Sequence, residues 1–123
     1  MKYLCLAYYN EKKFNELSKS EVDAIVSGCP PRDKALHESG QLVMVASLEA
    51  PSASTALRPR KGKTTVSDGP YMETKDQLGA FFIIEARDLN EAIRVASLHP
   101  AATLGEEVGW GIEIRPIDTY EQG

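Results

Sequence analysis

The 123-residue sequence lacks the features that mark several large classes of protein. It has only two cysteines, Cys5 and Cys29, and their spacing does not fit a zinc site. No apolar run approaches the about 18 residues of a membrane-spanning helix, and the N-terminus has no signal-peptide pattern. A glycine-rich phosphate loop and a dinucleotide fingerprint are also missing. We therefore expect a cytoplasmic protein with reduced thiols, no metal, no cofactor and no membrane contact.

An excess of positive charge is missing as well. The formal net charge is -4 and the pI is about 5.2, which argues against general binding to nucleic acid or to an anionic membrane. One basic cluster, 58–63, runs against this balance. Because Pro59 and Gly62 interrupt it, the cluster is more typical of a solvated hairpin tip than of a nucleic-acid site.

The length is that of one domain with a single core, so we treat residues 1–123 as one unit. Short apolar runs rich in aromatic and β-branched residues predict the main strands. Turn residues at Lys61-Gly62 predict a hairpin whose first strand holds Pro59, as an edge strand would. The predicted strands are 3–9, 42–48, 55–60, 63–67, 79–86 and 110–117.

Two helical regions separate these strands. Ser18 and Glu21 fit a capping box, and an apolar stripe follows at helical spacing. Since proline inside a helix removes a hydrogen bond and clashes with the preceding turn, Pro30-Pro31 divides this region into helices over 19–28 and 31–39. Asp88 begins a second amphipathic region that ends near His99-Pro100.

Without the hairpin, the order is strand, helix, strand, strand, helix, strand, which predicts an α+β fold of the ferredoxin-like split βαβ type with an inserted β-hairpin. In such a fold both helices cover one face of the sheet. The strands 3–9, 42–48 and 80–86 are apolar on both faces, however. We therefore expect a homodimer of the dimeric α+β-barrel type, in which the sheets of two copies cover each other.

The polar stretch 66–79 between two of these strands holds the candidate catalytic residues. Asp68 and Glu73 lie five residues apart across a turn, so their carboxylates could face one cavity and serve as an acid–base pair. The alternatives are that Asp68 caps backbone N–H groups and that Glu73 pairs with Lys75 or an arginine. Both alternatives stay open at the level of sequence.

Three further residues are candidates for substrate binding. Arg58 and Lys75 could hold a small anionic ligand, or they could be ordinary exposed cations. Tyr71 could contact the same ligand or simply pack against its neighbours. His37 and His99 each follow a predicted helix, where a cation suits the helix dipole, and Cys29 falls on an apolar stripe.

The stretch also carries a resemblance to a known family. Asp68-Gly69-Pro70-Tyr71, then Glu73-Thr74-Lys75, Gln77-Leu78-Gly79 and 86–92, resembles the DGPF domain family of YCII-related proteins, with Tyr71 where the family's namesake has Phe. The resemblance extends to both ends of the chain and implies a dimeric ferredoxin-like fold. Some enzymes of the wider superfamily use a His on the first helix and an Asp after the second. These positions fall near Cys29 and His99 here.

Two functions are compatible with these observations. The first is a cofactor-free small-molecule-binding protein or enzyme of the lyase or isomerase type, with its site around 68–75. The second, which the family resemblance implies, is a non-catalytic regulatory protein that works beside an extracytoplasmic-function sigma factor.

Overall fold

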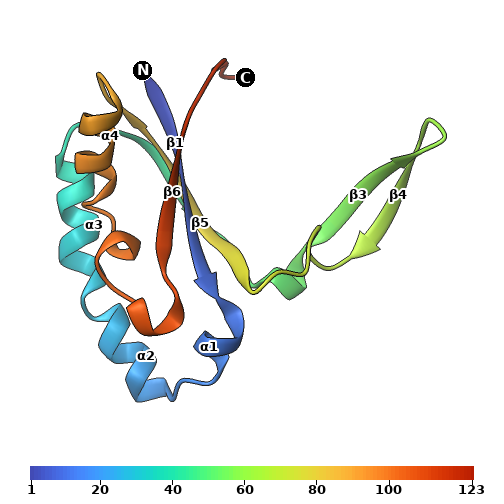
Figure 1. Cartoon of the computed structure of the whole chain (residues 1–123), viewed down its shortest axis with the longest axis horizontal. Helices are drawn as coiled ribbons and strands as arrows, with labels where there is room; N and C mark the ends of the chain where they lie inside the picture. Colours follow the sequence, from blue (N-terminus) through green and yellow to red (C-terminus); the bar gives the residue numbers. More distant parts are fainter.

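The computed structural model describes residues 1–123 as two antiparallel sheets and four α-helices (Figure 1). Three single 3₁₀ turns, 51–53, 100–102 and 106–108, complete the chain. The strands and helices, in chain order, are β1 (Lys2–Asn10), α1 (Glu11–Asn15), α2 (Lys19–Val26), α3 (Cys29–Glu38), β2 (Leu42–Ser47), β3 (Thr55–Arg60), β4 (Lys63–Asp68), β5 (Asp76–Glu85), α4 (Leu89–Ala96) and β6 (Gly111–Pro116).

The main sheet has the strand order β2-β5-β1-β6, and each neighbouring pair is antiparallel. With helices between β1 and β2 and between β5 and β6, this order is compatible with the predicted ferredoxin-like fold. The register between β1 and β5 shifts at Ala7/Tyr8, where Ala7 pairs with Ala80 and Tyr8 with Leu78. Such an irregularity bends the strand locally, and here it lies at the end of the sheet near the cavity described below.

The first helical region is divided as the sequence predicts. Ser18 and Glu21 form the complete capping box at the start of α2. Helix α3 begins at Cys29, two residues before the predicted start at 31, so both prolines lie in its first turn. Proline is tolerated there because the backbone N–H groups of the first turn have no partner within the helix. The short helix α1 lies where we expected only a polar connection. It begins because the Asn10 side chain accepts a hydrogen bond from the backbone N–H of Lys13.

The second helical region, α4, begins as predicted and ends early. The Asp88 carboxylate accepts the backbone N–H of Glu91 at its start. The last helical residue is Ala96 rather than His99, and the chain then turns into the 3₁₀ segment at Pro100. Proline disfavours the α conformation of the residue before it, which explains why the helix does not continue through His99.

The helices cover one face of the main sheet, and the core lies between the helices and that face. Tyr3, Cys5 and Phe82 point into this core and are almost completely buried, while Leu4 and Leu6 point to the opposite, open face and are partly exposed. No helix is both long and apolar enough to cross a bilayer.

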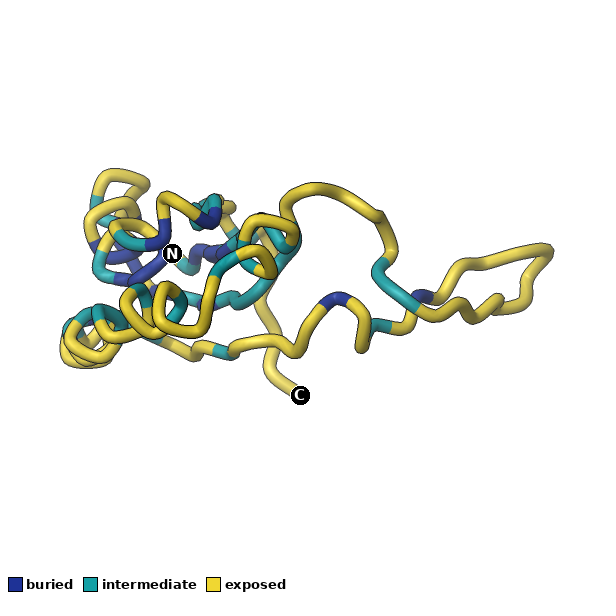
Figure 2. The backbone as a smooth tube through the Cα atoms, turned by 90° about the horizontal axis from the view of Figure 1, so that it is seen from below, coloured by how far each residue is buried: buried dark blue, intermediate teal, exposed yellow.

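Strands β3 and β4 form a separate two-stranded sheet, which we call the arm (residues 55–68). Its turn has positive φ at Lys61 (51°) and Gly62 (76°), the conformation that a two-residue hairpin turn requires. The arm extends away from the body on the side of the sheet that the helices leave open (Figure 1). Nearly all of it is exposed, whereas the buried residues concentrate in the body (Figure 2).

Candidate functional site

A cavity of about 430 Å³ lies between the main sheet and the helices, at the end of the sheet from which the arm departs. This volume is in the range of pockets that bind small molecules. Most of its wall is apolar and partly aromatic, formed by residues such as Tyr9, Phe14, Leu48 and Trp110. A thiol, a carboxylate and an imidazole also line it, those of Cys29, Asp33 and His99.

Helix α3 supplies the thiol and the carboxylate. Cys29 and Asp33 are four residues apart, so they lie on one face of the helix, one turn above the other. Leu36, in the next turn, is only 1% exposed and packs into the core. This anchor turns the Cys29–Asp33 side of α3 toward the sheet and hence toward the cavity. The Asp33 carboxylate forms no ion pair and no hydrogen bond within the chain.

The turn after α4 supplies His99. Its ring stacks on Phe82, with centroids 4.7 Å apart and planes 5° apart. Its Nδ1 accepts the backbone N–H of Ala101 at 3.0 Å. Burial, which disfavours the charged imidazolium, lowers the pKa of His99 below its ordinary value, against a smaller opposing effect of the Asp33 charge. His99 is therefore neutral at pH 7.

The Cys29 thiol is not activated. Its pKa is raised, first by burial and then by the negative charge of Asp33, while Arg32 acts weakly in the opposite sense. The thiol donates only a long contact of 3.9 Å to the Ile25 carbonyl. A nucleophilic cysteine needs a lowered pKa, so this environment favours a protonated, unreactive thiol.

Two aromatic rings of the cavity wall lie very close to the backbone of glycine residues. Tyr9 meets Phe14 edge to face, with ring centroids 5.8 Å apart. A Cβ at Gly79 would lie 3.0 Å from the Tyr9 ring, and one at Gly105 only 2.3 Å from the Trp110 ring. Glycine at these two positions therefore allows both rings to lie against the backbone and to line the cavity.

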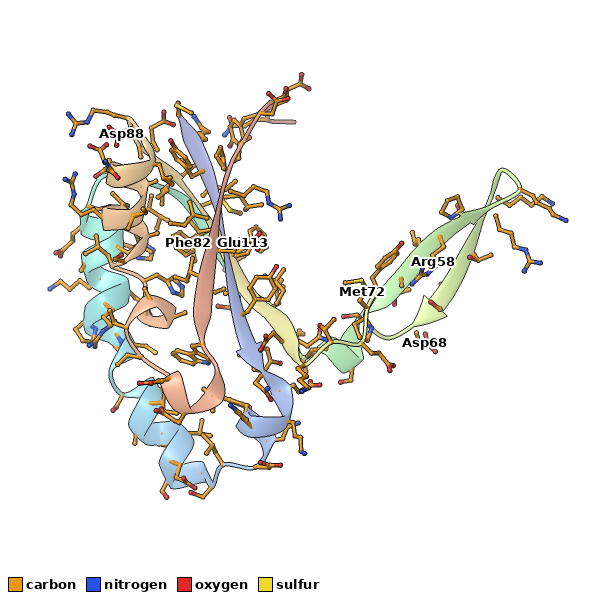
Figure 3. All side chains as sticks on the ribbon, in the orientation of Figure 1. Arg58, Asp68, Met72, Phe82, Asp88 and Glu113 are labelled. Carbon is orange, nitrogen blue, oxygen red and sulfur yellow. The ribbon has the colours of Figure 1, made fainter.

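The five residues that the sequence proposes for the site lie elsewhere. Asp68 ends β4, Arg58 lies in β3, and Tyr71, Glu73 and Lys75 lie in the exposed segment before β5. None of them lines the cavity. In Figure 3, Arg58, Asp68 and Met72 are grouped at the arm, far from Phe82 in the body.

Only two of these five side chains are shown in direct contact. The Arg58 guanidinium lies 4.0 Å from the centre of the Tyr71 ring and donates to the Tyr71 carbonyl at 2.9 Å. The Asp68 carboxylate accepts no hydrogen bond within the chain, so the alternative that it caps backbone N–H groups is wrong. Glu73 forms no ion pair with Lys75 or with an arginine, so that alternative is wrong too.

A second, open groove connects the segment before β5 to the cavity. Pro70, Tyr71 and Met72 line it on one side, and it shares Tyr8, Leu48 and Ala50 with the cavity wall. Tyr71 is thus the one predicted site residue that lines a groove adjoining the cavity.

The two histidines differ from each other. His37 is exposed in the last turn of α3, with Nδ1 2.8 Å from the Asp33 carbonyl, a helix-terminal position as predicted. His99 follows α4 as expected, but it is buried and lines the cavity instead of serving as an exposed cation at the helix end. No group of three or more His, Cys, Asp or Glu side chains is arranged to hold a metal ion.

Comparison with known proteins agrees with the motif around Asp68. The family model of the YCII-related domain matches residues 1–116. The chain belongs to the YCII-related family. Within this family it is similar to a Rhizobium meliloti (strain 1021) protein named "Uncharacterized protein R00369", with 32% identity over 123 residues that cover 100% of this chain and 97% of that protein.

Two positions that the sequence analysis singled out, Cys29 and His99, both line the cavity of this YCII-related protein. The carboxylate lies on the helix at Asp33 and the imidazole follows α4. The i, i+4 spacing of Cys29 and Asp33 is the sequence signal that could have pointed to this site.

Proposed function

We propose that the protein binds a small, mainly apolar molecule in the cavity and acts on it by cofactor-free acid–base chemistry of the lyase or isomerase type. The observation that supports this is the meeting of Asp33, Cys29 and His99 in a mainly apolar cavity. An apolar pocket with a few convergent polar groups, one of them with a shifted pKa, is the usual form of a small-molecule site.

In this proposal Asp33 accepts the proton. Its carboxylate lines the cavity and has no partner within the chain to neutralise it, so it is free to accept a proton from a bound ligand. Cys29, with its raised pKa, contributes shape and a weak donor rather than a nucleophile.

We propose that the segment 68–75 lies at the entrance to the cavity and contacts the ligand there. The groove lined by Tyr71 shares three residues with the cavity wall, which supports a path from the arm to the site. In this arrangement Tyr71, Arg58 and Lys75 would contact the polar end of the ligand as it enters. Asp68 and Glu73 would act as an acid–base pair only if a conformational change brought them to the ligand.

A thermal-shift screen of small apolar compounds, followed by substitution, tests this function. Asp33→Asn should abolish turnover, or weaken binding of a screened compound about tenfold or more, without loss of the fold. Glu38→Gln, on the exposed side of the same helix, is the matched control and should change neither. If Glu73→Gln or Asp68→Asn abolished activity while Asp33→Asn did not, the site would be the one around 68–75 instead.

We further propose that the protein is a homodimer of the α+β-barrel type, with the arm as the inserted hairpin. Apolar side chains on neighbouring strands, such as Leu4, Leu6, Phe81 and Ile83, share the open face of the sheet and are only partly covered. An isolated two-stranded hairpin is at best marginally stable in water, so the arm also gains from a partner. Sedimentation that gave a monomer at micromolar concentration would contradict this.

One observation favours a second function, that of a regulatory protein bound to an extracytoplasmic-function sigma factor. Leu57 and Val66 pair across the arm and are 59% and 67% exposed. Co-purification of the sigma factor with the wild-type protein and its loss with Leu57→Ser would support this function. We also propose a cytoplasmic location, which agrees with two unpaired cysteines.

A further inference from the structure

The two ring nitrogens of His99 have different surroundings. Nδ1 accepts a hydrogen bond from the backbone N–H of Ala101 at 3.0 Å. A backbone N–H can only donate, so Nδ1 must present its lone pair. In a neutral imidazole the proton then lies on Nε2, which makes Nε2–H a hydrogen-bond donor and prevents it from accepting a proton.

Nε2 is open to the cavity. No residue of the chain forms a hydrogen bond with it, yet no fully buried side-chain nitrogen or oxygen in the structure lacks a partner. Nε2 is therefore accessible, although the residue as a whole is only 9% exposed. Because His99 lines the cavity, this access is from the cavity.

The direction of this donor is held by its surroundings. The ring lies parallel to Phe82 at 4.7 Å, and the Ala101 N–H holds its other edge. A donor that is fixed before the ligand arrives loses little entropy on binding and stabilises negative charge where it develops.

We infer that the ligand of this cavity is an uncharged carbonyl compound with an apolar body, whose carbonyl oxygen accepts a hydrogen bond from His99 Nε2–H. The apolar wall takes the body of the ligand. The unpaired carboxylate of Asp33 lines the same cavity and repels a ligand carboxylate, which favours a ketone, aldehyde or ester over an anion. This inference rests on the proposed function and names its substrate class.

The same arrangement allows a proton transfer in which Asp33 first takes up a proton from the ligand and later returns it. Asp33 removes a proton from the carbon next to the carbonyl and becomes a neutral acid. The electron pair of the broken C–H bond moves to the carbonyl oxygen, and the resulting enolate is held by Nε2–H. When the ligand has a carbon–carbon double bond next to that carbon, the enolate is a dienolate. Return of the proton from Asp33 to its far carbon moves the double bond, completes an isomerisation and regenerates the carboxylate.

Two measurements test the inference. Nitrogen-15 NMR should show His99 as the Nε2–H tautomer at neutral pH. In amide-shift titrations, acetophenone should bind about tenfold more tightly than ethylbenzene, the gain expected for one hydrogen bond in a desolvated site, and more tightly than benzoate.

Substitutions at His99 then separate the donor from the shape of the ring. His99→Phe should remove the preference for acetophenone over ethylbenzene, and His99→Gln, which retains an N–H donor, should restore part of it. An Nδ1–H tautomer, equal binding of acetophenone and ethylbenzene, or an unchanged preference in His99→Phe would overturn this inference alone. If none of the three compounds perturbed the amides of the cavity, the proposed function would be overturned and this inference with it.

Discussion

His99 shows how much of the chemistry of this site depends on the surroundings of a single side chain. A stacked ring, a backbone N–H and burial together place it in one orientation and in the neutral form. Asp33 opposes the effect of burial on the pKa of His99, and it raises the pKa of the nearby Cys29 thiol. The three groups in the cavity therefore differ in role: a carboxylate, a neutral donor and an unreactive thiol.

Stability should depend on pH through His99. Because its pKa is lowered from 6.5 by folding, the unfolded chain binds this proton at higher pH than the folded chain does. The free energy of unfolding should thus fall as pH drops below about 6.5. Urea midpoints measured between about pH 7 and about pH 5 check this.

His99→Phe is the control for that measurement, because it removes the titrating group and keeps a stacked ring. Its stability should change less over the same range. Glu85 and Glu91 have pKa values lowered from 4.5, so their contributions are lost mainly at more acidic pH. A wild-type slope no steeper than that of His99→Phe would contradict the prediction.

The two thiols should differ in reactivity. Burial raises the pKa of Cys5 to about 12, and this residue is fully buried. At neutral pH a disulfide reagent should modify Cys29 slowly and reach Cys5 only when the chain unfolds. Cys29→Ser should then show no reaction in the folded state. Reaction of Cys29 faster than that of a free small thiol would show an activated cysteine.

At the scale of elements, turns supply an important part of the cavity wall, beside α3 and the main sheet. The turn 99–101 carries His99, and the segment 105–110 carries Trp110. Gly105 has a φ of 72°, and its backbone carbonyl accepts the N–H of Trp110 at 3.0 Å. Left-handed backbone and close ring contact coincide at this one position, so the aromatic wall relies on glycine there.

Gly105→Ala should destabilise the fold and widen or distort the cavity. The left-handed backbone costs about 1 kcal/mol or more for alanine, and the displaced Trp110 ring adds to that. Gly40→Ala is the matched control, since Gly40 has a φ of 75° and no atom within 4 Å of an added Cβ. Urea denaturation should show a larger loss for Gly105→Ala. Equal losses would mean that the Trp110 contact has no energetic weight.

At the scale of the whole molecule, two apolar surfaces are left uncovered: the open face of the main sheet and one side of the arm. Leu57 and Val66 share one side of the arm, whereas Arg58, Arg60 and Lys63 share the other. The open face of the sheet and the arm both lie on the side of the molecule away from the helices (Figure 1). A second copy packed on that side would cover the open face, which is the physical basis of the proposed dimer.

A charge at the centre of the open face should dissociate this dimer. Leu6→Asp places a carboxylate on the central strand β1, next to Phe81, and should lower the mass in sedimentation from dimer to monomer with little change in circular dichroism. Val26→Asp is the control, because Val26 is an exposed apolar residue of α2 on the helical layer. A stable dimer of Leu6→Asp would exclude this face as the interface.

Elements with a strong local signal were predicted well. The capping box at Ser18, the turn at Lys61-Gly62 and the start of the second helical region at Asp88 depend on neighbouring residues alone. Helix α1 was missed because its only signal is a single capping side chain, that of Asn10. The charge and the family motif of 68–75 predict a site in that stretch, whereas other residues line the cavity.

The sequence by itself determined the family, the α+β class and the approximate positions of most strands and helices, since these depend on short-range patterns and on a long continuous motif. Only the tertiary structure placed Asp33 and His99 in one cavity. They lie on elements far apart in the chain, and they meet because α3 and the turn after α4 pack on the same face of the sheet. The neutral state of His99 is likewise a property of burial against Phe82 and the Ala101 N–H, which no local pattern encodes.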